Sequence, residues 1–298
     1  MMAAMPLFVF VIENIQFFFR ATFDNKRFSQ LSFIYTLLIV TFQISFAVMW
    51  DVKGVVLGRY LGAVLTIIIA AFLLSRIHFF KNKVSLPDFG ELKRMLKYGI
   101  TMSLTNAASL MMLLNEVFII GYLLKNTQLL ADYKVASYIL TISLFVTQSI
   151  ALFVTPYFSK HSADKQWVYK TFKKLSLYNA LGMIPLHIGL IIFAKSFLII
   201  IFGAQYSSAA FIMQMLLIAS LFQSIFRMLP GNILSVIGYE YYNLRLNIFF
   251  LITHVIIDLL AISYFGIMGA ALGLIFVYAS SGIILTLKIR KVTKVTLA

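Results

Sequence analysis

Ionisable side chains lie inside long apolar runs of this sequence, where a charge is costly and usually faces a polar partner or a wet cavity. His254 and Asp258 are four residues apart, so on a helix they can touch, and Glu116 lies in an earlier run. An imidazole beside a carboxylate can take up a proton near neutral pH. Together with Glu13, near the middle of the first run, these residues are predicted to bind a coupling cation.

Two of the apolar runs carry a polar stripe. Residues spaced by four, three and four positions share one helical face. The two series are Thr105, Ser109, Met112 and Glu116, and Asn247, Leu251, His254 and Asp258. Matched stripes predict the wall of a water-filled interior. The alternative interpretation is that each polar side chain only hydrogen bonds between neighbouring helices.

Arginine is also rare at membrane depth. Arg59 lies roughly 7 Å inside its run, at 1.5 Å per residue, and Arg227 and Arg245 lie near the ends of theirs. Two interpretations of Arg59 remain open. Its side chain either extends back to the outer interface or binds an anionic headgroup.

The composition shows which elements must position these residues. The chain has 298 residues, of which 61% are hydrophobic and 12% charged, and its mean hydropathy is +0.95. These values exclude a soluble enzyme, a coiled coil and a disordered chain. The sequence predicts an all-α polytopic membrane protein with about nine helices of roughly 20 residues each. The predicted spans are 3–22, 30–50, 54–75, 97–123, 133–158, 175–194, 206–226, 243–264 and 267–287.

The basic residues predict the orientation of the spans. Of the 25 Lys and Arg residues, 20 fall in alternate loops and the C-terminal tail, which predicts a cytoplasmic C-terminus. The net charge of +15 then reflects topology and contacts with membrane lipids, and no nucleic-acid partner is expected. With nine spans, an odd number, the positive-inside rule predicts that the N-terminus is external, although almost nothing precedes the first span. We therefore expect a chain that lacks an odd number of upstream spans, and the alternative is a genuine nine-span protein.

The loops divide the chain into predicted parts. Residues 1–75 form a first group of spans, 76–96 a basic cytoplasmic loop, 97–287 a second group and 288–298 a basic tail. Glycines at every fourth position, at 54, 58 and 62 and again at 269 and 273, predict close helix packing.

No catalytic chemistry is expected. The chain has no Cys and four His residues without the spacing of metal ligands, so neither a metal site nor a cofactor is predicted. Phosphate-binding loops and nucleophile elbows are absent as well, which argues against an enzyme.

A series of short motifs carries a family resemblance. Glu116 is followed by Gly121, Asp132 and the segments 133–137, 202–210, 231–238 and 264–271. In this order they resemble the polysaccharide-transporter family, which includes the O-antigen and exopolysaccharide repeat-unit flippases, of the MATE-like exporter superfamily. The resemblance implies two six-helix lobes. Residues 97–287 match the complete second lobe and 3–75 the last three helices of the first, so the chain is expected to be truncated at its N-terminus.

The resemblance also implies a function. A flippase of the bacterial cytoplasmic (inner) membrane would move polyprenyl-diphosphate-linked oligosaccharides by alternating access, coupled to H⁺ or Na⁺. It would work with a polysaccharide polymerase and glycosyltransferases. Arg59, Arg227, Arg245 and Asn247 are then candidates to bind the diphosphate and sugar. Two alternatives remain: a cation-coupled multidrug antiporter of the same superfamily, and an inactive remnant or membrane scaffold.

Overall fold

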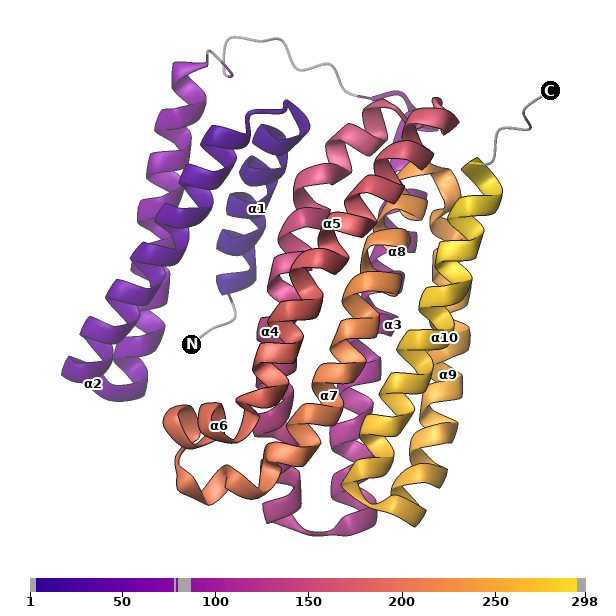
Figure 1. The fold of residues 1–298 in the computed structure, drawn as a ribbon. Helices are drawn as coiled ribbons and strands as arrows, with labels where there is room; N and C mark the ends of the chain where they lie inside the picture. Colours follow the sequence, from indigo (N-terminus) through magenta and orange to yellow (C-terminus); the bar gives the residue numbers. More distant parts are fainter. Residues whose placement is uncertain (1–3, 78, 80–86, 294–298) are drawn as a thin grey trace. The chain divides into compact units, whose positions relative to one another are not determined.

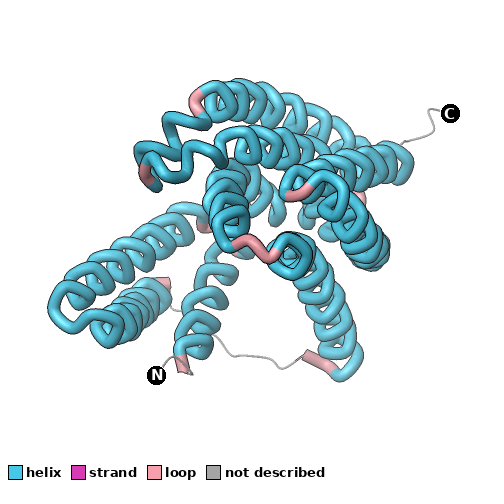
Figure 2. The backbone as a smooth tube through the Cα atoms, turned by 90° about the horizontal axis from the view of Figure 1, so that it is seen from below, coloured by secondary structure: helices cyan, strands magenta, loops and turns pink. Residues whose placement is uncertain are grey.

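The computed structural model describes residues 4–77, 79 and 87–293. Helices joined by short loops make up almost all of this part of the chain, and it contains no strand (Figure 2). The chain divides into two compact units, Met1–Asp88 and Phe89–Ala298, called here the first and the second unit.

The first unit is built from two helical elements. Helix α1 spans Met5–Ala21 and α2 spans Asn25–Arg76. Non-helical backbone angles at Trp50 and Asp51 break α2 into two halves that fold back on each other, at the predicted junction between the second and third spans (Figure 1). The stripe of Gly54, Gly58 and Gly62 packs directly on the backbone of the first half. The predicted close packing is confirmed there, because a side chain at these positions would collide with backbone atoms.

The second unit is a bundle of long helices. Its elements are α3 (Phe89–Leu124), α4 (Thr127–Lys160), α5 (Lys165–Ile192), α6 (Ala194–Phe202), α7 (Ala210–Phe222), α8 (Leu229–Leu234), α9 (Glu240–Phe265) and α10 (Ile267–Thr293). Two π-helical segments, Gln223–Met228 and Ser235–Tyr239, join α7, α8 and α9. The basic starts of α3 and α5 and the basic ends of α4 and α10 lie at one end of the unit (Figure 1).

Six helical stretches in the described residues are long and apolar enough to cross a membrane. Two of them, Asn25–Arg76 and Ala204–Phe265, each contain a break that separates two spans. The prediction of an all-α polytopic membrane protein is confirmed, and the span count agrees roughly. Helix α3 begins at Phe89, within the predicted loop 76–96. The helix that contains the predicted span 206–226 continues to a break at Ile237 and Gly238, where the backbone angles are non-helical.

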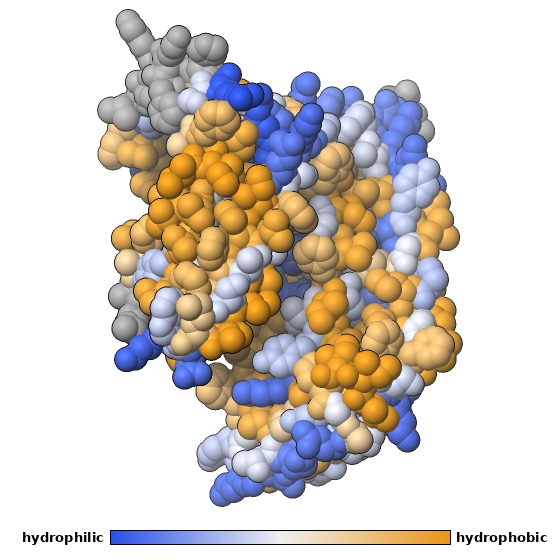
Figure 3. Space-filling model, turned by 90° about the vertical axis from the view of Figure 1, so that its left-hand side faces the viewer, coloured by the Kyte–Doolittle hydropathy of each residue, from blue (hydrophilic) through white to orange (hydrophobic). Residues whose placement is uncertain are grey.

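The core of the second unit lies between α3, α4, α7, α9 and α10, where Met112, Leu216, Leu274 and Tyr278 are fully buried. Many large apolar side chains instead face outward, among them Phe118 and Ile200. Figure 3 shows wide apolar areas on the surface, with hydrophilic residues toward the upper and lower ends. An exterior of this kind suits a lipid surrounding.

Candidate functional site

A cavity of about 480 Å³ with both apolar and polar lining residues opens into the second unit. Its polar lining consists of hydroxyl and carboxamide side chains and one guanidinium: Thr105, Asn106, Ser109, Gln148, Thr155, Gln223, Asn232, Asn243, Asn247 and Arg227. The lining includes neither an acidic nor an aromatic residue. The cavity is therefore neutral except for a single positive charge.

The irregular stretch between α7 and α9 positions the Arg227 guanidinium in the cavity. Gln223 and Arg227 lie on the π-helical segment Gln223–Met228, and Pro230 follows at the start of α8. A π-helical turn shifts the helical register of the residues after it, and such turns are frequent at functional sites. Asn243 on α9 donates to the carbonyl oxygen of Gly231 (3.1 Å), which gives this backbone group a partner near the irregular turns.

Arg227 is only 7% exposed, yet no acidic side chain of the described residues pairs with it. Its Nη2 atom donates to Oδ1 of Asn247 (2.6 Å) and lies 3.4 Å from Sδ of Met112. The guanidinium carbon is 5.1 Å from the ring centre of Tyr278, a cation–π contact. The positive charge is therefore held in place but not neutralised.

A chain of amide and hydroxyl groups holds Asn247 in position. Its Oδ1 atom also accepts from Ser109 Oγ on α3 (3.0 Å), and its Nδ2 atom donates to Oδ1 of Asn243 (3.0 Å). Asn243 donates in turn to Ser235 Oγ (3.0 Å). The network joins α3, α9 and the irregular turns, so the position of Arg227 depends on all of them.

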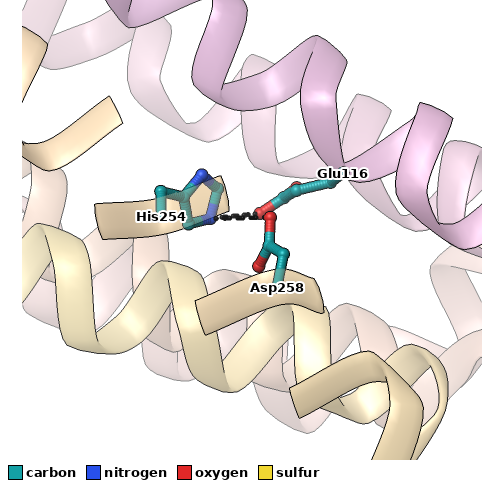
Figure 4. A group of neighbouring side chains, drawn as sticks. All are labelled: Glu116, His254 and Asp258. Carbon is teal, nitrogen blue, oxygen red and sulfur yellow. Dashed lines mark ion pairs between the residues drawn. The ribbon is translucent and has the colours of Figure 1, made fainter. Parts of the chain in front are cut away.

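Farther along α3 and α9, Glu116, His254 and Asp258 form a buried cluster (Figure 4). Nε2 of His254 lies 3.1 Å from Oε1 of Glu116 and 3.4 Å from Oδ2 of Asp258. The Tyr133 hydroxyl on α4 donates to Oε2 of Glu116. Neither ring nitrogen of His254 has a hydrogen-bond partner among the described residues. The four-residue spacing predicted the His254–Asp258 contact, but the approach of Glu116 and Tyr133 depends on packing between helices.

The predicted water-filled wall extends only along the upper part of the two stripes. Thr105, Ser109 and Asn247 line the cavity, whereas Glu116 and Asp258 are enclosed by protein. The expectation that the acidic ends of the stripes face a water-filled interior is therefore wrong. Residues of α4 and α10 surround the two acids. The spacing of residues along α3 and α9 could not predict these contacts with other helices.

Gly273 on α10 belongs to this cluster although the sequence indicated only a packing role. A Cβ atom at this position would lie 2.6 Å from Oδ1 of Asp258. Gly273 therefore leaves the space that the Asp258 carboxylate occupies. Tyr133 was likewise not predicted as a site residue. Its place in a family motif was the only sequence signal for it.

The remaining predicted residues lie elsewhere. Arg245 is exposed on α9, with its guanidinium over the ring of Tyr241 (4.4 Å), and it does not line the cavity. Arg59 and Glu13 belong to the first unit. Arg59 is half-buried and Glu13 is exposed on α1. The structure thus brings Arg227 to Asn247, and Glu116 to His254 and Asp258, but it does not join Arg245 to either group.

Comparison with known proteins gives one curated relative and several solved structures. The probable low-salt glycan biosynthesis flippase Agl15 of Haloferax volcanii is 24% identical over 223 residues, which are 74% of this chain and 46% of that protein. The chain thus spans about half the length of this curated relative.

Among solved structures, a mutant of a MATE protein matches 96% of this chain and 66% of its own, with a TM-score of 0.86 and 15% identity. A MOP-superfamily transporter from Pyrococcus furiosus matches 90% of this chain and 62% of its own, with a TM-score of 0.77 and 15% identity. At these identities the likeness shows the fold alone.

A protein-family model described as "Polysaccharide biosynthesis protein" matches residues 1–211. This match covers well over half of the 298 residues. The chain therefore belongs to this family of polysaccharide biosynthesis proteins, and its fold is that of the MATE transporters of the MOP superfamily.

Proposed function

We propose that the protein moves polyprenyl-diphosphate-linked oligosaccharides across the cytoplasmic membrane as a flippase of surface polysaccharide synthesis. The observation that carries this proposal is the unneutralised charge of Arg227 in a cavity whose other polar lining residues are all carboxamides and hydroxyls. A guanidinium offers paired donors to phosphate oxygens, and amides and hydroxyls match sugar hydroxyls as donors and acceptors. The curated relative is named as a glycan biosynthesis flippase, which supports the same substrate class.

The dimensions of the cavity suggest how such a substrate is held. A volume of about 480 Å³ lies within the range of roughly 300–1,000 Å³ common to small-ligand pockets. The cavity therefore suits the diphosphate and the nearest sugar, while the apolar tail stays in lipid. Alternating access would carry the polar head across the hydrocarbon layer.

A coupling cation, H⁺ or Na⁺, is assigned in this proposal to Glu116, His254 and Asp258. Met112 connects the two sites, because it contacts Arg227 and lies one helical turn from Glu116 on α3. Glu13 in the first unit remains a further candidate for coupling, as Arg59 does for substrate. The basic residues predict a cytoplasmic C-terminus, and the protein would work together with glycosyltransferases and a polysaccharide polymerase.

A multidrug antiporter is the second candidate function. The buried acids Glu116 and Asp258 favour it, and one structural neighbour is a multidrug resistance MATE transporter (TM-score 0.78, 14% identity). A site for cationic drugs would be expected to present acidic and aromatic side chains. The cavity in the second unit presents neither, so this function ranks below the flippase.

The test measures binding and translocation separately. Purified chain in detergent is titrated with a fluorescent polyprenyl-diphosphate disaccharide, with the uncharged polyprenyl disaccharide and with a cationic dye. We expect the diphosphate lipid to bind best. R227Q should weaken this binding by about tenfold or more, whereas R94Q, which removes an exposed arginine of α3, should leave it unchanged.

Proteoliposomes then report whether the labelled headgroup crosses the bilayer. Translocation that depends on Arg227 supports the flippase. Binding of the dye without the lipid supports the antiporter. Lipid binding without translocation by the 298-residue chain, combined with activity of a longer form, supports the scaffold or remnant.

A further inference from the structure

We propose that Glu116, His254 and Asp258 form a binding site for a divalent transition-metal ion of the Zn²⁺, Co²⁺ or Ni²⁺ class. Each residue offers one ligand atom, and the three atoms lie within 4.8 Å of one another. Within the described residues, this is the one group of His and acidic side chains that meets such a criterion. The sequence predicted no metal site, since the ligands come from two helices and show no local motif.

The separations between the ligand atoms fit a small metal ion. Metal–nitrogen and metal–oxygen bonds of about 2.0–2.2 Å in a tetrahedron place neighbouring ligand atoms roughly 3.3–3.6 Å apart. Nε2 of His254 lies 3.1 Å from Oε1 of Glu116 and 3.4 Å from Oδ2 of Asp258. Two of the three separations are therefore close to the spacing around such an ion, and the third is at most 4.8 Å, so that an ion would bind after the side chains shift.

Several buried nitrogen and oxygen atoms of the cluster lack hydrogen bonds in the part of the chain that the structure describes, which is typical of a site that binds a ligand. His254 is completely buried, and neither of its ring nitrogens has a hydrogen-bond partner among the described residues. Oε1 of Glu116, which faces Nε2 of His254, has none either. Nε2 of His254 meets the two carboxylates only at ion-pair distances, without hydrogen bonds. Buried polar atoms that lack hydrogen bonds are costly, and a cation between them would bind Nε2 and both carboxylates together.

The donor set selects the class of cation. Imidazole nitrogen suits zinc, nickel and copper, whereas calcium and magnesium prefer oxygen ligands. Two carboxylates balance the charge of a divalent ion, so the metal-bound cluster is neutral in its enclosed position. Three protein ligands also leave a fourth position open, as in zinc sites that bind water.

The other two histidines that the structure describes, His161 and His187, offer no comparable site. Both ring nitrogens of His187 are engaged, by the Met183 carbonyl oxygen (2.8 Å) and by Ser220 Oγ (2.7 Å). His161 stacks on Trp167 (ring centroids 4.2 Å apart) and bonds to the Tyr157 carbonyl oxygen. His78 lies outside the described residues. With no cysteine in the chain, Co²⁺ spectra would report nitrogen and oxygen ligands only.

This inference concerns the cluster to which the proposed function assigns the coupling cation, but its test does not require translocation. A bound transition metal would occupy the place of that cation and block coupled transport. Metal binding measured in detergent can therefore fail while lipid translocation succeeds, and the reverse also holds.

The experiment titrates the full chain, freed of its affinity tag and of metals, with Co²⁺. We expect one bound ion per chain, visible in the absorption bands of low-symmetry Co²⁺ and displaced by Zn²⁺. H254Q should weaken binding by more than about tenfold, and D258N should do the same. H161Q is the matched control and should bind as the wild type does.

Two results would overturn the inference. One is the absence of stoichiometric Co²⁺ binding, and the other is equal binding by the wild type, H254Q and D258N. Competition on the wild type keeps the test decisive if a variant fails to fold. Excess Mg²⁺ should leave the Co²⁺ spectrum unchanged, and displacement by Mg²⁺ would contradict a nitrogen-containing site.

Discussion

Arg227 donates a 2.6 Å hydrogen bond to the carboxamide oxygen of Asn247, and this neutral partner leaves the guanidinium charge uncompensated. A carboxylate at the same position would fix the guanidinium equally well but would cancel its charge. Asn247 thus determines both where the charge of Arg227 lies and that it stays available to an anionic ligand.

The first prediction concerns Asn247→Asp. The new carboxylate should pair with Arg227 and weaken binding of the polyprenyl-diphosphate lipid by about tenfold or more, because the ligand must compete with an internal anion. Fluorescence titration in detergent measures the effect. Asn126→Asp is the control, since Asn126 caps the start of α4, where Asp serves equally well. Undiminished binding by N247D would contradict the assignment of the cavity.

The second prediction concerns stability. A buried guanidinium without an acidic partner carries a desolvation cost that its amide contact offsets only in part. Arg227→Gln should therefore retain or raise the thermal unfolding midpoint in detergent while it weakens lipid binding by about tenfold or more. A large fall in the midpoint of R227Q would instead indicate a structural role for Arg227.

The third prediction concerns the space beside Asp258. In Gly273→Ala, the added methyl group would lie 2.6 Å from Oδ1 of Asp258 and must displace the carboxylate. We expect a loss of about 1–3 kcal/mol in stability and weaker Co²⁺ binding. Gly99→Ala on α3 is the matched control, because nothing lies within 4 Å of its Cβ position. That change should raise helix stability by up to about 1 kcal/mol. Equal behaviour of the two variants would count against the tight contact.

The fourth prediction separates coupling from substrate binding. Glu116→Gln removes an ionisable carboxyl group from the buried cluster but leaves the lining of the cavity unchanged. Uptake of labelled lipid driven by an imposed H⁺ or Na⁺ gradient should fall by about fivefold or more, whereas lipid binding in detergent should stay close to that of the wild type. If gradient-driven transport persists in E116Q, the coupling site lies elsewhere, with Glu13 as the next residue to test.

Much of the helical architecture follows from the sequence, because hydropathy and helical periodicity are local properties. The break of α2 at Trp50 and Asp51 coincides with the charged residues that separate two apolar runs. The contact of His254 with Asp258 follows from their spacing on one helix. The helical continuation past residue 226, up to the break at Ile237 and Gly238, was not predicted, because Pro230 and Gly231 usually end a helix. Here Asn243, on another helix, bonds the Gly231 carbonyl group.

The sequence by itself determined that the chain is an all-α membrane protein, roughly where its helices lie, and which polar residues share a helical face. Only the tertiary structure decided how those faces are used. It separated Arg227 from Arg245, placed Glu116 against His254, and enclosed the acids behind α10, where Gly273 leaves room for Asp258. The reason is physical: spacing defines neighbours within one helix, but contacts between helices depend on the packing of side chains that are far apart in the chain.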